Sequence, residues 1–146
     1  MTSQAFRFIH ASDFHLEAPV DGLIECPERL ENVILDAPRA AVERFFTVAI
    51  NEKVDFVVLS GDLISPRDAG PWGMIFLIEQ FEKLAAEHIP VYWAAGKSDS
   101  PDLMPAAFRF PENVHIFPVG SVEELFFTRD GVPIARIFGT SFGKTG

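Results

Sequence analysis

Short apolar runs alternate with longer segments of helical periodicity along the first two thirds of the chain. The apolar runs cover residues 5–11, 54–60 and 91–95, and the second of them, VDFVVLS, is almost uninterrupted. Continuous runs of this kind are typical of strands that are buried on both faces of a parallel sheet. The pattern therefore predicts three strands at these positions.

Two helices are expected between these strands. The first is predicted to begin with Asp36 as its cap and Pro38 in its first turn, which are favoured residues at a helix start. Its apolar positions fall on one stripe: Val42, Phe45, Phe46 and Ala49. The second is predicted over residues 72–88, before Pro90, with the stripe Met74, Leu77, Ile78, Phe81, Leu84 and Ala85. A polar loop with Pro19, Gly22 and Pro27 is expected before the first helix.

The rhythm changes after residue 111. NVHIF predicts a short strand, and the apolar segments VEELFFT and VPIARIFGT flank an Asp-Gly pair at Asp130 and Gly131. Asp-Gly between two apolar runs is a strong signal for a β-hairpin. Strand–helix–strand order implies parallel pairing with right-handed crossovers. We therefore expect an α/β fold, a mainly parallel sheet with flanking helices and a C-terminal antiparallel hairpin, in one domain over residues 1–146.

Composition narrows the class of protein. The chain has 146 residues, of which 48% are hydrophobic and 23% charged, as in globular domains. A net charge of −9 opposes nucleic-acid binding by a broad basic surface, although it allows contact with a phosphate through a metal ion. The single Cys26 excludes an intrachain disulfide, and no run approaches the about 20 apolar residues that span a bilayer. The expectation is a cytoplasmic protein with no membrane segment.

Polar clusters follow each of the three predicted parallel strands. Asp13 and His15 come after the first strand, Asp62 after the second, and the segment GKSD at residues 96–99 after the third. Ligands of open α/β sheets bind at the carboxyl ends of the strands. Because Asp and neutral His suit ions such as Mn, Fe or Zn, the spacing predicts a divalent metal site formed by Asp13, His15 and Asp62.

Each of these residues also has a structural interpretation. Asp at a strand end is common in ordinary turns, and Lys97 is equally expected as a solvated loop lysine. His10 and His115 are interpreted as structural side chains of strands. His88 is interpreted as a residue near a helix C-terminus, where its charge favours the helix dipole.

The order of motifs resembles the signature of calcineurin-like metallophosphoesterases: D-x-H comes first, then G-D, then a polar motif after the third strand. FIHASDFHLE is especially similar to the DNA-repair exonuclease (SbcD-type) branch, which reads H-[ST]-[SA]-D-x-H-L-G, with Glu17 here in place of Gly. VDFVVLSGDLI and HIPVYWAAG are similar to the second and third motif strands of that branch. The resemblance covers about residues 6–142 and implies the N-terminal part of a metallophosphoesterase sandwich.

The resemblance implies a site with two divalent ions, most often Mn, that hydrolyses phosphodiesters such as those of DNA. Asp13, His15 and Asp62 would hold the first ion, with Asp62 reaching toward the second. Lys97 and Ser98 replace the Asn and His of the family's third motif, while Asp99 keeps the acidic position. An ammonium group has only hydrogen-bond donors and cannot ligate a cation. No catalytic residue is assigned.

We therefore expect a degenerate site with one ion or none, in which Lys97 is the charge partner at the second-metal position, neutralising the nearby carboxylates. The family's later His ligands are missing from the chain up to Gly146. Without the later strands the sheet would expose apolar surface, which predicts a homodimer or a missing C-terminal part. The alternative function is a non-catalytic scaffold or interaction module. A nucleotide-binding domain is a weaker alternative because the chain has no G-x-G-x-x-G motif or P-loop.

Overall fold

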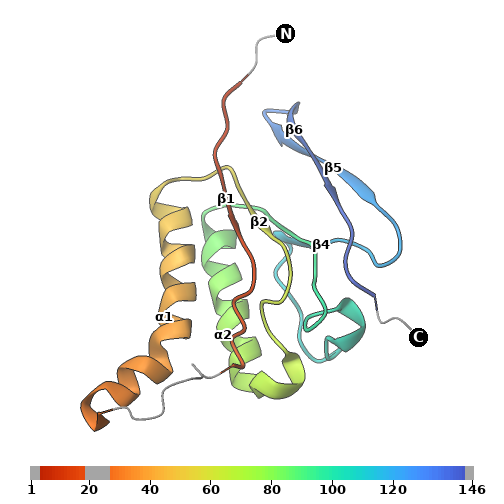
Figure 1. Ribbon diagram of the computed structural model, residues 1–146. Helices are drawn as coiled ribbons and strands as arrows, with labels where there is room; N and C mark the ends of the chain where they lie inside the picture. Colours follow the sequence, from red (N-terminus) through yellow and green to blue (C-terminus); the bar gives the residue numbers. More distant parts are fainter. Residues whose placement is uncertain (1–3, 19–26, 144–146) are drawn as a thin grey trace.

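The computed structural model describes residues 4–18 and 27–143 (Figure 1). The predicted loop positions Pro19 and Gly22 lie outside the described residues, as does Cys26. The elements follow in the order β1 (Phe8–Ala11), α1 (Glu28–Asn51), β2 (Phe56–Leu59), α2 (Pro66–Ala86), β3 (Val91–Trp93), a 3-10 helix η1 (Pro101–Leu103), β4 (Val114–Ile116), β5 (Glu123–Arg129) and β6 (Val132–Gly139).

Strands β1 to β4 form one parallel sheet in sequential order, and β5 and β6 form a separate antiparallel pair. Phe8 pairs with Phe56 between β1 and β2, and Val57 pairs with Val91 between β2 and β3. Parallel neighbours need a crossover, and α1 and α2 supply the first two. The predicted α/β class with its C-terminal hairpin is confirmed.

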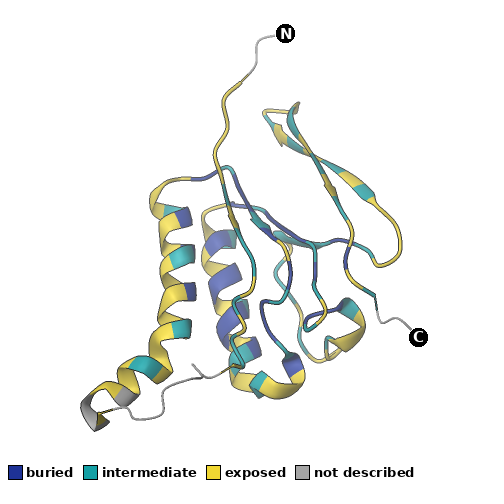
Figure 2. Cartoon of the chain, in the orientation of Figure 1, coloured by how far each residue is buried: buried dark blue, intermediate teal, exposed yellow. Residues whose placement is uncertain are grey.

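The sheet carries a different core on each face because successive side chains of a strand point in opposite directions. On one face, Leu59 and Trp93 of the sheet pack against Phe46 of α1 and Phe81 of α2 in the same core. On the other face, the sheet and the segment after β4 contribute Phe56, Tyr92 and Phe117, which pack against the hairpin residues Leu125, Phe127, Ala135 and Ile137. Figure 1 shows the two helices on one side of the sheet and the hairpin on the other. The dark residues of Figure 2 accordingly gather where the helices face the sheet.

The hairpin turn has the geometry that its sequence predicts. Asp130 and Gly131 have φ values of 50° and 77°, as type I′ turns require at both central positions. The last residue of β5, Arg129, forms an ion pair with Asp55, which precedes β2. The end of the hairpin is therefore tied to the amino-terminal edge of the parallel sheet.

The predicted start of α1 was wrong. The helix begins at Glu28, and Pro38 lies inside it instead of in its first turn. The segment ERLENVIL, before Pro38, is rich in helix-forming residues, which favours a helix that begins before the proline. Pro38 has no N–H to donate within the helix, but this loss does not prevent the helix from forming there.

The second helix agrees more closely with its prediction. Gly70, with φ 64° and ψ −171°, interrupts α2, and the continuous part after this kink corresponds to the predicted helix. Its buried side chains include four residues of the predicted stripe: Met74, Leu77, Phe81 and Leu84. Over the described ranges, no helix has the length and apolar character needed to cross a membrane.

Candidate metal centre

The loops after β1 and β2 are joined by main-chain hydrogen bonds. The Asp13 N–H donates to the Gly61 carbonyl at 3.0 Å, and the His15 N–H donates to the Asp62 carbonyl at 3.1 Å. These contacts extend the parallel pairing beyond the last residues of the strands. The D-x-H and G-D motifs are thereby held side by side at the carboxyl edge of the sheet, where α/β folds bind ligands.

The backbone of these loops is unusual. Asp13, His15 and Asp62 all have positive φ, at 57°, 45° and 54°. Each such conformation costs on the order of 1 kcal/mol for a residue with a side chain, and clusters of them mark functional loops. Gly61 also has positive φ, at 83°, and a Cβ added there would lie 2.7 Å from the Gly96 Cα. Glycine is required at position 61 by both its conformation and the close approach of the third loop.

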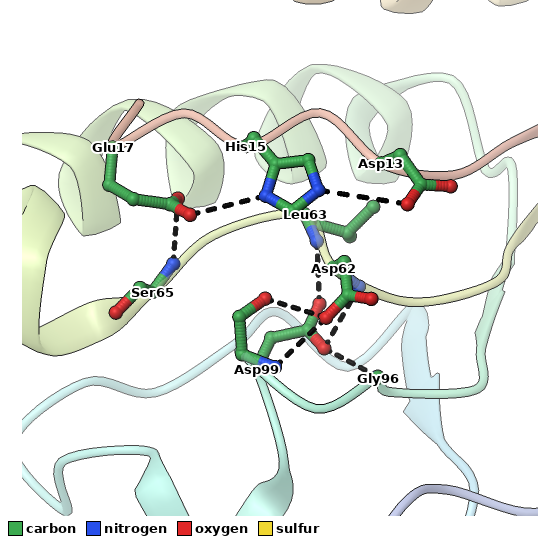
Figure 3. A network of polar contacts seen from close by, with 9 residues as sticks. Asp13, His15, Glu17, Asp62, Leu63, Ser65, Gly96 and Asp99 are labelled. Atoms are coloured by element: carbon green, nitrogen blue, oxygen red, sulfur yellow. Dashed lines mark hydrogen bonds and ion pairs between the residues drawn. The ribbon is translucent and has the colours of Figure 1, made fainter. Parts of the chain in front are cut away.

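Asp13 and His15 place an oxygen atom and a nitrogen atom close together on the loop after β1. The His15 Nε2 lies 3.6 Å from the Asp13 Oδ1, and the two side chains are 47% and 63% exposed. The other ring nitrogen, Nδ1, lies 3.3 Å from the Glu17 Oε1 (Figure 3). The ring is therefore placed between two carboxylates of its own loop.

Asp62 is held by the third loop. Its Oδ1 accepts hydrogen bonds from the Ser98 N–H at 2.9 Å and the Ser98 hydroxyl at 2.8 Å. The Ser98 N–H and then its hydroxyl lower the pKa of Asp62, outweighing the opposite effect of burial, and His15 lowers it further. The Asp62 carboxylate is therefore ionised near neutral pH, as a metal ligand must be.

Asp99 points into the protein instead of into the cleft. It is fully buried, and it accepts hydrogen bonds from the N–H groups of Asp62 at 3.1 Å, Leu63 at 2.8 Å and Gly96. Burial raises the pKa of Asp99, while the Leu63, Gly96 and Asp62 N–H groups lower it. The acidic position of the third motif thus joins the second and third loops through their main chains.

Lys97 lies on the wall of a cleft of about 540 Å³ that also contains His15, Glu17, Asp62 and Ser98. Its side chain is exposed, and within the described ranges its ammonium makes no ion pair with any carboxylate. The cleft wall is therefore positively charged at position 97. The assignment of Lys97 as a charge partner of the carboxylates stays a prediction.

The fit of these residues to a metal ion is partial. Asp13 and His15 offer an oxygen and a nitrogen of the right chemistry close together, and Asp62 lies on the adjoining loop. Yet no three His, Cys, Asp or Glu side chains in residues 4–18 and 27–143 form a group arranged to hold an ion. The donors fit a half-site, and the assignment of all three residues as ligands stays a prediction.

Glu17 is the contact that the sequence did not indicate. It departs from the motif only by replacing Gly, yet its carboxylate reaches both His15 and the Ser65 N–H. The acidic residue two positions after the histidine was the available signal.

Comparison with known proteins agrees with this geometry. The family model described as calcineurin-like phosphoesterase matches residues 6–142. The chain is also 37% identical over 135 residues to a Bacillus subtilis (strain 168) protein named "Uncharacterized metallophosphoesterase YhaO", over 92% of this chain and 33% of the relative. The fold and the strand-end motifs define a phosphoesterase-type domain. The chain belongs to the calcineurin-like phosphoesterase family, and it spans about a third of that relative's length.

Proposed function

We propose that this chain is the N-terminal module of a Mn²⁺-dependent phosphodiesterase related to DNA-repair exonucleases, with a site that is degenerate at the second-ion position. The observation that carries the proposal is the pair formed by His15 Nε2 and Asp13 Oδ1, which lie 3.6 Å apart on the loop after β1. Main-chain hydrogen bonds hold this loop beside the loop that carries the ionised Asp62. The similarity of FIHASDFHLE to the exonuclease branch supports DNA or another phosphodiester as substrate.

Asp13, His15 and Asp62 would hold the ion, which when bound supplies Lewis-acid polarisation of a phosphate oxygen and an activated water. Ser98 keeps Asp62 oriented and ionised through two hydrogen bonds. Lys97 adds a positive charge to the same cleft, where it disfavours a second cation and attracts phosphate oxygens. With these roles the site would hold one ion, whereas the resemblance of the chain to the family implies two.

A metal titration tests the proposal. Calorimetry should detect Mn²⁺ binding to the 146-residue chain, and Asp13→Ala should abolish it because a ligand oxygen is removed. Asp102→Ala, at an exposed position in η1, is the matched control and should bind like the wild type. Hydrolysis of bis(p-nitrophenyl) phosphate should require Mn²⁺ and Asp13. Absence of binding at millimolar Mn²⁺ would overturn the proposal.

A non-catalytic interaction module is the second candidate. It is favoured by the lack of a three-ligand group in the described part of the chain and by an ammonium group in the cleft. Aromatic side chains on the outer face of the hairpin, Phe126 and Phe138, offer an apolar surface for a partner. Under this alternative the chain binds no Mn²⁺ and still folds and associates.

A further inference from the structure

Glu17 connects the candidate ligand His15 to the start of α2. Its side chain is only 12% exposed. Oε1 lies 3.3 Å from the His15 Nδ1, and Oε2 accepts a hydrogen bond from the Ser65 N–H at 2.8 Å. Figure 3 shows the carboxylate between the imidazole ring and residue 65. Among the described residues, each carboxylate oxygen therefore has one partner, and the two partners belong to different loops.

The hydrogen-bond geometry indicates which ring nitrogen carries the proton. Carboxylate oxygens accept hydrogen bonds, and Oε2 of Glu17 already accepts the Ser65 N–H, so the contact between Oε1 and the His15 Nδ1 favours a proton on Nδ1. The Nε2 atom lies 3.6 Å from the Asp13 Oδ1, beyond hydrogen-bond distance, and needs no proton. In the neutral ring Nε2 therefore keeps a free lone pair on the side of Asp13.

We propose that Glu17 is a positioning residue that holds the His15 ring in the Nδ1–H tautomer, so that Nε2 is free to ligate a cation. Carboxylates that accept the second N–H of a ligating histidine fix its orientation and raise its basicity. The inference rests on the proposed function for the identity of the cation. It concerns this chain in particular, because Gly, the residue usual in the exonuclease branch, has no side chain that could make the contact.

A purely structural role makes a different prediction. The Ser65 N–H belongs to the residue that caps α2, and a carboxylate near a helix N-terminus is stabilising in any protein. If that were the whole role, removing Glu17 would lower stability and leave the ring unchanged. The tautomer of His15 separates the two roles, because it depends only on the Oε1 contact.

The first measurement is ¹⁵N NMR of the histidine rings in the metal-free 146-residue chain at neutral pH. Wild-type His15 should be in the Nδ1–H form, assigned by comparison with His15→Gln. Glu17→Ala should shift the ring toward the Nε2–H form, while Glu82→Ala, at an exposed position on α2, should not. A wild-type ring in the Nε2–H form, or an unchanged ring in Glu17→Ala, would overturn the inference, and the wild-type spectrum decides even if the variant unfolds.

The second measurement is Mn²⁺ affinity by calorimetry of the same proteins. Glu17→Ala should raise the Kd about 10- to 100-fold, the usual effect of losing such a partner. A shifted tautomer with an unchanged Kd would refute a role in ligation. If wild-type protein binds no Mn²⁺ but its ring is in the Nδ1–H form and responds to Glu17→Ala, the proposed phosphodiesterase function fails and the control of His15 by Glu17 stands.

Discussion

Asp62 donates its main-chain N–H to the buried carboxylate of Asp99, with 3.1 Å between nitrogen and Oδ1. The same carboxylate accepts the N–H groups of Leu63 and Gly96. A single buried side chain thus fixes the loop that carries one candidate ligand against the loop that follows β3. The orientation of Asp62 depends on this contact as well as on Ser98.

Replacing Asp99 should therefore destabilise the protein. In Asp99→Asn, the side-chain NH₂ group must face at least one main-chain N–H that the carboxylate now satisfies. Leaving a buried donor without an acceptor costs about 1–3 kcal/mol. Urea unfolding followed by circular dichroism would measure this loss. Asp102→Asn, at an exposed position, is the control, and equal stability of the two variants would contradict the anchoring role.

Lys97→Asn tests the charge partner at the second-metal position. If the ammonium offsets the carboxylates of the cleft, the variant should melt at a lower temperature than the wild type in metal-free buffer. Removing a positive charge near the ion should also strengthen Mn²⁺ binding by about 1 kcal/mol, about fivefold in Kd. Thermal unfolding with EDTA and calorimetry with Mn²⁺ measure the two effects. An unchanged or higher melting temperature would rule out the neutralising role.

Asp55 gives the stability of the protein a dependence on acid pH. Burial raises its pKa, but the Arg7 N–H at 2.7 Å and the Arg129 guanidinium outweigh burial and bring the pKa below its usual value of 3.8. A lowered pKa in the folded state adds stability above pH about 4, which is lost as pH falls through the folded-state value.

The matching experiment compares wild-type protein with Asp55→Asn. At pH 6 the variant should be less stable by about 1 kcal/mol, since it loses the ion pair with Arg129. The difference should shrink as the pH falls below about 4 and through the lowered pKa of Asp55, because protonation of the wild-type carboxyl removes its charge. Urea unfolding at each pH provides the measurement. A difference that stays constant over this range would show that the charge of Asp55 is not the cause.

The outer face of the hairpin should mediate association. Phe126 and Phe138 are 50% and 57% exposed, with the Arg136 guanidinium 5.9 Å and 5.1 Å from their rings. An apolar surface of this kind favours contact with a second copy or with the remainder of a longer chain. Sedimentation should show a concentration-dependent dimer that Phe138→Ser weakens. If Trp72→Ser, on α2, dissociated the dimer and Phe138→Ser did not, the interface would lie on the helical side of the molecule instead of on the hairpin.

The fold was accessible from the sequence where periodicity and turn chemistry agree. Runs such as VDFVVLS predict buried parallel strands, and Asp130-Gly131 predicts the turn that forms. The start of α1 was missed because Pro38 favours a first turn only as a tendency, which the helix formers before it overcome.

The site was accessible only in part. Strand ends on one edge of a sheet bring Asp13, His15 and Asp62 onto adjoining loops, and this follows from topology. The partners of Glu17 and Asp99 do not, because each bonds to a main-chain N–H far away in the sequence: Ser65 is 48 residues from Glu17, and Leu63 is 36 residues from Asp99. Every residue except proline has such a donor, so no residue type marks these two long-range contacts in advance.

The pairing of the Asp13 and His15 N–H groups with carbonyls of the neighbouring loop has a consequence for how this family can change. Hydrogen bonds between peptide groups of the two loops do not depend on the exposed side chains that these loops carry. Substitutions of exposed side chains, such as Lys for Asn at position 97, can therefore accumulate while the hydrogen-bonded loops keep their conformation. Metal binding at this edge of the sheet can be lost, changed in affinity or replaced by binding of a partner while the fold is retained.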